Sequence, residues 1–311
     1  SSDLEKISNL LKNKNITFFS DFQTNPQFND VLKGIKKLRY SQCEIIIAIG
    51  GGSVIDMAKL INYYKEFQNK KFDCKYQENN FLPFIAIPTT AGSGSEATHF
   101  AVIYNNKIKY SIANQKLIPD FVILDSLLIN NISKEQFAAS TLDALCHSIE
   151  SFWSISATRK SKKYARFAIR IALNAIQQNN NENMLLAAHL AGKSINITKT
   201  TGAHATAYYL TSHFNIQHGI AVALMMPIFI QYNSPKYELL EIFSCKNSED
   251  LTLKFKEIMA TLGISDKMSH YSIKKGDLNN IIENINSERM KNNPTIFDKT
   301  QLLDLLSYNY N

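Results

Sequence analysis

The sequence predicts a two-domain fold in which an α/β domain with a parallel sheet precedes an all-helical domain. The chain has 311 residues, a length that suggests two domains. Strand and helix patterns alternate over roughly the first 130 residues, which is typical of a parallel sheet with crossover helices. From Ser133 onward, helical periodicity dominates. We therefore expect domains at 1–130 and 131–311.

The elements of the first domain follow from apolar patterning and from the residues that interrupt it. We expect strands at 16–19, 43–49, 84–88, 100–104, 109–112 and 121–125. The strand at 43–49 is almost continuously apolar, as expected when both faces are buried. Asn105 and Asn106 predict a turn that pairs the strands on either side of them. We expect helices at 4–11 and 28–38, and a third that begins at Ser53.

Helical periods fill the second domain. The expected helices cover 134–155, 158–178, 182–197, 201–213, 219–232, 249–262, 275–287 and 298–307. Ser133 and Gln136 have the spacing of a capping box at the start of the first. The polar run from Asn179 to Asn183 predicts a loop within the domain and not a domain boundary.

Composition excludes several classes of protein. A hydrophobic content of 45% and a charged content of 20% favour a large core over global disorder. No apolar run reaches the ~18 residues of a membrane span, and the first residues do not resemble a secretory signal. The four cysteines show no pairing pattern, so we expect reduced thiols in a cytoplasmic protein.

The net charge of +7 is spread along the chain. No basic run is interleaved with aromatic residues, which argues against nucleic-acid binding. An anionic cofactor or substrate would benefit from the same positive field, although compositional bias towards lysine and asparagine explains the charge equally well.

Asp143 and His147 are spaced to share one face of a helix. Four positions separate them, which places their side chains one turn apart. A carboxylate and an imidazole in this arrangement can bind one divalent metal ion, and His204 and His218 could complete a four-ligand site. For the pair alone, an exposed carboxylate and a hydrogen-bonded core histidine is an equally good interpretation.

The downstream histidines can meet only if the chain turns between them. His204 and His218 are fourteen residues apart, which on one straight helix would separate them by ~21 Å. Asn215 to Gly219 supplies the loop that this requires. His213 is nine residues from His204 and should point the other way on a helix, as an exposed or structural residue.

Two loops rich in small residues follow expected strands of the first domain. Gly50 to Gly52 join a strand to a helix that begins at Ser53, a combination that suits a pyrophosphate, although a tight strand–helix turn is an equal alternative. The second loop carries Thr89 and Thr90, which could donate hydrogen bonds to a nucleotide. In open α/β sheets, ligands bind beyond the carboxyl ends of the strands.

Four segments together resemble the iron-dependent (group III) alcohol dehydrogenase family. They are GGGSVIDMAK at 50–59, PTTAGSGSE at 88–96, DALCHSIES at 143–151 and the HA…HG run at 204–219. They have the order and approximate spacing of that family, and the resemblance covers nearly the whole chain. It implies an NAD(P)-dependent, metal-containing alcohol dehydrogenase or aldehyde reductase, with a dinucleotide-binding domain at 1–130 and a metal- and substrate-binding domain at 131–311.

The resemblance also implies site residues. The metal, Fe²⁺ or else Zn²⁺, would be bound by Asp143, His147, His204 and His218. NAD or NADP would be bound by Asn25, Gly51, Gly52, Ser53, Asp56, Thr89, Thr90 and Lys109, with the pyrophosphate on Gly51, Gly52 and Ser53.

Two departures from the family pattern stand out. The family usually has a further histidine four residues after the third ligand, where this sequence has Tyr208, so Tyr208 becomes the candidate for proton relay. The family also normally opens with a strand and a helix before the segment that resembles 4–20. We therefore expect the first edge of the sheet to be open.

Shorter segments resemble the branch of the family that includes phosphonoacetaldehyde reductases. They begin at Lys109, Glu150, Ala191 and Ser287. That branch acts in phosphonate biosynthesis and reduces the aldehyde to 2-hydroxyethylphosphonate, so we expect a small anionic aldehyde as substrate.

Lys199 and Arg159 are the candidate partners of the phosphonate. We expect a homodimer, with neither nucleic acid nor membrane as partner. The alternatives are a generic short-chain alcohol dehydrogenase of the same family, a lyase similar to dehydroquinate synthase, and an inactive metal-binding protein.

Overall fold

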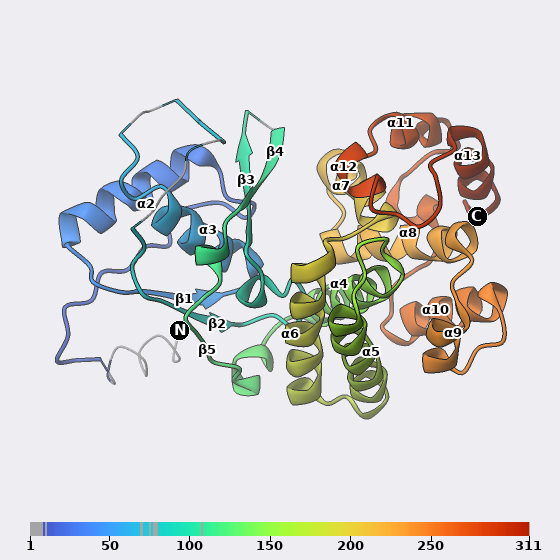
Figure 1. Cartoon of the computed structure of the whole chain (residues 1–311), viewed down its shortest axis with the longest axis horizontal. Coiled ribbons are helices and arrows are strands. Elements are labelled where there is room, and N and C mark those ends of the chain that lie inside the picture. Colours follow the sequence, from blue (N-terminus) through green and yellow to red (C-terminus); the bar gives the residue numbers. More distant parts are fainter. Residues whose placement is uncertain are drawn as a thin grey trace. The chain divides into compact units, whose positions relative to one another are not determined.

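A computed structural model describes residues 9, 11–68, 71–74, 76, 80–106 and 108–310 of the chain. The chain forms two compact units (Figure 1). The first comprises Ser1–Thr89 and Ser95–Asn130, and the second comprises Thr90–Gly94 and Asn131–Asn311. The helix expected at 4–11 lies almost wholly outside the described residues.

The first unit is built on a parallel sheet. Its strands lie in the order β1 (Ile46–Gly50), β2 (Phe84–Pro88) and β5 (Phe121–Val122), with Ile46 opposite Phe84 and Ile85 opposite Phe121. Helix α3 (Gly52–Tyr63) follows β1 and packs on the sheet, where its Ile55 and Ala58 bury Ala48 and Ala86. The parallel sheet expected from the continuous apolar runs is confirmed.

The rest of the first unit covers the other side of α3. Helix α2 (Phe28–Ser41) packs on α3, and β3 (Phe100–Asn105) pairs antiparallel with β4 (Ile108–Ala113), as the sequence predicted. Aromatic rings fill the space between these elements, and several meet edge to face, which adds to the gain from their burial.

Two strand predictions were wrong. Residues 16–19 form no strand, because a strand needs a neighbour to hydrogen-bond and no described segment pairs with them. Phe19 instead stacks on Phe22 at 5.6 Å and packs against the aromatic core. Strand β5 stops at Val122 and not at Asp125, whose side chain accepts a hydrogen bond from the Leu127 N–H and so starts a 3₁₀ turn.

A buried lysine holds α3 to the segment that follows β2. Lys59 is fully buried, and its ammonium donates to the carbonyl oxygens of Ser95 and Thr98 at 2.6 Å each and of Phe100 at 2.8 Å. One turn away, Asp56 accepts hydrogen bonds from the Ser95 hydroxyl at 2.5 Å and from a backbone N–H at 3.0 Å. Burial lowers the pKa of Lys59 to about 8, although neighbouring Asp56 opposes this shift.

Replacing Lys59 with methionine is expected to lower the free energy of unfolding by about 3 kcal/mol, because three carbonyl groups at least half-buried lose the ammonium donor. Urea unfolding followed by circular dichroism measures the effect. Lys37→Met, at an exposed position of α2, is the matched control and should change little. A loss below about 1 kcal/mol at Lys59 would show that these carbonyls find other partners.

The second unit is helical throughout its described part. Its helices are α4 (Lys134–Trp153), α5 (Arg159–Gln178), α6 (Asn181–Thr198), α7 (Gly202–Phe214), α8 (His218–Asn233), α9 (Tyr237–Phe243), α10 (Ser248–Thr261), α11 (Leu278–Glu283), α12 (Ser287–Met290) and α13 (Lys299–Tyr308). Helix α8 is the centre of the unit: residues 219–230 are all buried, and α4, α7, α10 and α13 pack around it (Figure 1).

Three details of the helical prediction were wrong. Helix α9 was not expected, since its apolar run is short. The expected loop at 179–183 shrinks to two residues, because Asn179 ends α5 in the left-handed conformation and Asn180 immediately caps α6. The helix expected at 275–287 is broken after Glu283, and Asn286 caps the separate helix α12.

The glycines of the segment Thr90–Gly94 allow it to lie against the helices of the second unit. A Cβ added at Gly92 would lie 2.8 Å from the Ser140 carbonyl oxygen. One added at Gly94, where φ is +60°, would lie 2.5 Å from the Cα atom of Gly192. These close approaches account for the two glycines by packing alone.

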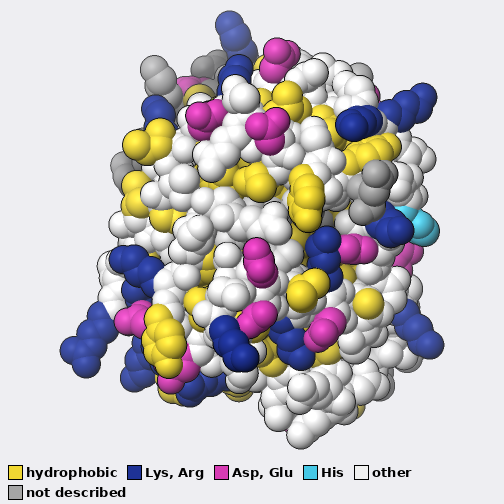
Figure 2. Space-filling view, turned by 90° about the vertical axis from the view of Figure 1, so that its right-hand side faces the viewer, with side chains coloured by type: hydrophobic (Ala, Val, Ile, Leu, Met, Phe, Trp, Pro, Cys, Tyr) yellow, Lys and Arg dark blue, Asp and Glu magenta, His cyan; other side chains and the backbone are white. Residues whose placement is uncertain are grey.

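One face of the molecule shows the scattered charge expected from the sequence. Figure 2 shows one face, on which basic and acidic side chains are interspersed and apolar ones occur singly or in small groups. No helix in the described part of the chain has the combination of length and apolarity that crossing a bilayer requires.

Candidate functional site

Helix α4 places Asp143 and His147 on one buried face. Its first turn is capped by Ser133, whose hydroxyl accepts the Gln136 N–H at 3.1 Å. One turn of helix separates Asp143 from His147, and the Asp143 Oδ1 atom lies 3.7 Å from the His147 Nε2 atom. Both residues are buried, with exposed fractions of 7% and 6%.

His204 reaches this face from α7, and His218 lies beside His204 at the start of α8. The His204 Nε2 atom lies 3.3 Å from Asp143 Oδ1, and its ring stacks on that of His147 at 4.5 Å. The chain turns at Asn215, whose φ of 53° ends α7, and His218 begins α8 with its ring 5.5 Å from that of His204. The turn between the two histidines is therefore confirmed.

Ligand atoms of Asp143, His147 and His204 all lie within 4.8 Å of one another. Both Nε2 atoms face the same carboxylate oxygen, and 3.7 Å is too long for a hydrogen bond. A cation at this point would satisfy the carboxylate and both imidazoles together. One oxygen donor with imidazole nitrogens is a set that suits Fe²⁺ or Zn²⁺, so the residues present fit a divalent metal.

Burial and mutual charge shift the pKa values of these groups. Burial lowers the pKa of His147 to about 4, so this imidazole is neutral at pH 7 and able to bind a cation. Burial alone would raise the pKa of Asp143, but His147, His204 and His218 outweigh it and hold the value below its usual range. Burial likewise opposes charge on His204, yet Glu150 and Asp143 raise its pKa to about 10.

Two further residues of α7 lie at different distances from this cluster. The ring of Tyr208 stacks on that of His218 at 5.7 Å, with an interplanar angle of 9°. His213 is exposed, and its ring packs on Tyr209 at 3.9 Å. The prediction that His213 points away from the ligands is confirmed.

The predicted pyrophosphate turn forms the N-terminus of α3. Gly51 is the N-cap residue, no acidic side chain lies in the first turn, and Gly51, Gly52 and Ser53 are all half-buried. An anion would meet the positive end of the helix dipole here. The Ser53 hydroxyl accepts the Asn25 N–H at 3.3 Å, so the predicted adenosine-side residue lies beside the turn.

The other predicted cofactor residues are divided between the two units. The Thr89 N–H donates to the Gly50 carbonyl at 3.0 Å, which places Thr89 at the turn, whereas Thr90 belongs to the second unit. Asp56 is occupied by hydrogen bonds within the first unit, and burial raises its pKa despite Lys59 beside it. Lys109 lies near enough to favour the charged form of Asp56.

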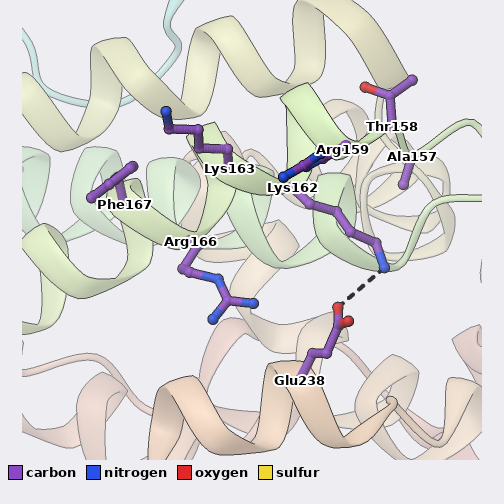
Figure 3. A pocket seen from close by; sticks show the side chains of 8 residues that line it. All are labelled: Ala157, Thr158, Arg159, Lys162, Lys163, Arg166, Phe167 and Glu238. Carbon is purple, nitrogen blue, oxygen red and sulfur yellow. Dashed lines mark hydrogen bonds and ion pairs between the residues drawn. The ribbon is translucent and has the colours of Figure 1, made fainter.

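The two predicted phosphonate partners, Lys199 and Arg159, are both exposed, and their role stays a prediction. Lys199 pairs with Glu288 at 2.9 Å. Arg159 lines a surface pocket on α5 together with Lys162, Lys163, Arg166 and Glu238 (Figure 3). Lys162 and Glu238 form an ion pair at 3.3 Å across it, and the described residues that line it include none of the predicted metal ligands.

Glu150 was not predicted as a site residue. It lies seven residues after Asp143 and three after His147, so helical geometry places it on the same face of α4. It is fully buried, and its carboxylate contacts the Nδ1 atom of His204. The spacing of Glu150 from Asp143 and His147 could therefore have predicted it as a third polar side chain on this face of the helix.

Comparison with known proteins identifies the family. A family described as "Iron-containing alcohol dehydrogenase" matches residues 1–126, and one described as "Fe-containing alcohol dehydrogenase family, C-terminal" matches residues 137–310. The chain belongs to the iron-containing alcohol dehydrogenase family. The resemblance read from the four motifs is confirmed at this level.

Curated relatives within the family are longer than the matched region. Aldehyde-alcohol dehydrogenase 2 of Entamoeba histolytica is 28% identical over 84% of this chain and 33% of its own length. The probable alcohol dehydrogenase EutG of Escherichia coli is 32% identical over 67% of this chain and 56% of its own length. The 1,3-propanediol dehydrogenase of Klebsiella pneumoniae is 31% identical over 70% and 60%. The chain thus spans less than two thirds of each.

Solved structures of the family share the fold. The NAD⁺ complex of sulfoacetaldehyde reductase from Bifidobacterium kashiwanohense aligns with a TM-score of 0.91, at 24% identity, over 99% of this chain and 88% of that one. A 1,3-propanediol oxidoreductase aligns with a TM-score of 0.93 at the same identity and coverage. The predicted α/β domain followed by a helical domain is confirmed.

Proposed function

We propose that this chain is a metal-dependent, NAD(P)H-linked reductase of small aldehydes. The observation that carries the proposal is the buried cluster of Asp143, His147 and His204, with the ring of His218 beside it. A carboxylate and several imidazoles buried together are expensive unless they share a cation. Family membership and the NAD⁺ complex of a related structure support the same chemistry.

The side chains divide the work of this reaction. When bound, the cation would act as a Lewis acid towards the substrate oxygen, and the nicotinamide would be the hydride donor. Asp143, His147, His204 and His218 would hold the cation, and the buried faces of α4 and α7 would keep water from it. Gly51, Gly52 and Ser53 would hold the pyrophosphate at the start of α3.

We propose phosphonoacetaldehyde as the substrate, with 2-hydroxyethylphosphonate as the product. Support comes from the segments that resemble the phosphonoacetaldehyde reductase branch and from the structural similarity to a sulfoacetaldehyde reductase, whose named substrate is also an anionic aldehyde. The relatives named 1,3-propanediol dehydrogenase and butanol dehydrogenase favour a second candidate, an uncharged short-chain aldehyde or alcohol.

An aldehyde panel tests the proposal. Metal-stripped protein is reloaded with Fe²⁺ or Zn²⁺ and assayed for NADH and NADPH oxidation with phosphonoacetaldehyde, sulfoacetaldehyde and propionaldehyde. A kcat/KM for phosphonoacetaldehyde well above that for propionaldehyde supports the anionic substrate. The reverse order replaces it with the second candidate, and no turnover of any aldehyde with either metal overturns the reductase itself.

Tyr208 is the proposed proton donor to the product oxygen. Tyr208→Phe keeps the ring that stacks on His218 and removes only the hydroxyl, so it is expected to retain metal but to lower kcat by roughly a hundredfold. Steady-state kinetics with metal analysis of the same samples checks this. A kcat equal to that of the wild type would assign the proton to solvent instead.

A further inference from the structure

Glu150 contacts His204, a predicted metal ligand, through its Oε2 atom. The side chain comes from α4, is fully buried and meets donors from the start of α7. Its Oε1 atom accepts the Thr201 hydroxyl at 2.9 Å, the Ala203 N–H at 2.8 Å and the His204 N–H at 3.2 Å. Its Oε2 atom contacts the Nδ1 atom of His204.

We propose that Glu150 is a positioning residue that fixes the ring of His204 for metal binding. This inference rests on the proposed function. In the neutral form of the ring, which metal binding requires, a carboxylate against Nδ1 keeps the proton on that nitrogen and leaves the lone pair on Nε2. The Nε2 atom is the one that faces Asp143 at 3.3 Å. Histidine ligands are commonly oriented in this way by an acceptor behind the ring, which also makes the ring more basic.

The alternative is that Glu150 only caps α7, whose first N–H groups lack partners within the helix. The two roles use different oxygens. The capping bonds all go to Oε1, whereas Oε2 faces the imidazole. The Thr201 hydroxyl oxygen also accepts a hydrogen bond from the Trp153 indole N–H at 2.9 Å. The Oε1 side can therefore be altered without touching the His204 ring.

The contact places a buried carboxylate against an imidazole and against backbone N–H groups of α7. A carboxylate that stays charged while fully buried needs this number of donors. Oε1 thus meets the donors at the start of α7, while Oε2 meets the ring of His204, whose Nε2 atom faces Asp143.

A pair of variants separates positioning from capping. Glu150→Gln preserves the shape of the side chain and keeps one acceptor oxygen for the N–H groups of α7. When that oxygen faces α7, the NH₂ group of the glutamine faces Nδ1 of His204 and cannot accept a hydrogen bond from it. Thr201→Val, the matched control, removes a donor to Oε1 and leaves Oε2 intact. Metal-stripped samples are titrated with Co²⁺, whose visible absorption reports binding. Thermal unfolding of the metal-free samples is followed by circular dichroism.

We expect Glu150→Gln to bind Co²⁺ about 10–100-fold more weakly than the wild type and to release it faster. Thr201→Val is expected to lower the melting temperature but to keep an affinity close to the wild-type value. Glu150→Gln with unchanged affinity, or a Thr201→Val variant that loses as much affinity as Glu150→Gln, would overturn the positioning role and leave capping.

Nitrogen-15 NMR of the zinc-loaded wild type provides a test that needs no variant. The His204 resonances are expected to show a protonated Nδ1 and a metal-bound Nε2, and the opposite assignment would reject the inference even if Glu150→Gln failed to fold. A wild-type protein that binds neither Co²⁺ nor Zn²⁺ would instead remove the metal centre of the proposed function, and the role of Glu150 with it.

Discussion

Replacing Asp143 with asparagine is expected to lower metal affinity at least about a hundredfold while the protein remains folded. Asp143 is the only carboxylate among the predicted ligands, and its Oδ1 atom faces two imidazole nitrogens at 3.3 and 3.7 Å. Four-ligand sites bind zinc with roughly 10–16 kcal/mol, so one ligand accounts for about 3 kcal/mol, or about a hundredfold in affinity. Asparagine has nearly the same volume, so packing on α4 should persist.

Metal content after dialysis, measured by mass spectrometry, checks this expectation, with circular dichroism as the test of folding. His218→Ala is expected to lose metal as well. His213→Ala, on the exposed side of α7, is the control and should retain wild-type metal content and turnover. If Asp143→Asn retained as much metal as the wild type, this cluster would not be the metal site.

Replacing Gly219 with alanine is expected to lower the free energy of unfolding by about 3 kcal/mol or more and to release the metal. Gly219 follows His218 and lies where α8 crosses α4. A Cβ there would lie 1.8 Å from the Ala139 carbonyl oxygen and 3.0 Å from the Cβ atom of Asp143. The first of these is backbone, so no change of rotamer relieves the clash, and α8 must move away from α4 with His218 attached.

Denaturant unfolding of the metal-free protein and metal analysis of the folded fraction measure the two effects separately. Gly276→Ala is the matched control, because an added Cβ there meets nothing within 4 Å. A Gly219→Ala protein with wild-type stability and metal content would show that the two helices can separate at this point without cost.

Periodicity predicted the helical unit well because its helices are long. Helices α4 and α5 each run for 20 residues, which gives the apolar pattern several turns in which to repeat. Helix α9, with 7 residues, offers too few turns. The segment 16–19 has an apolar strand pattern, but the pattern does not show whether a pairing strand lies beside it.

Spacing alone predicted part of the site. Asp143 and His147 are close because helical geometry requires it, whereas the approach of His204 and His218 depends on how α7 and α8 pack on α4. The residues alone offered these two histidines as candidates, and the family resemblance assigned them as ligands. Glu150 was missed because its role depends on contact with α7, and the ion pair of Lys199 with Glu288 was not predicted because the two residues lie far apart in the sequence.

All the predicted metal ligands come from α4, α7 and α8 of one compact unit, while the glycine turn belongs to the other. A metal ion whose protein ligands all belong to one compact unit requires no ligand from the other unit to stay bound. In the proposed reaction, oxidised coenzyme can dissociate and reduced coenzyme can bind over many turnovers while the same cation stays bound. Mutations that retune coenzyme preference at the glycine turn could then accumulate without disturbing the ion.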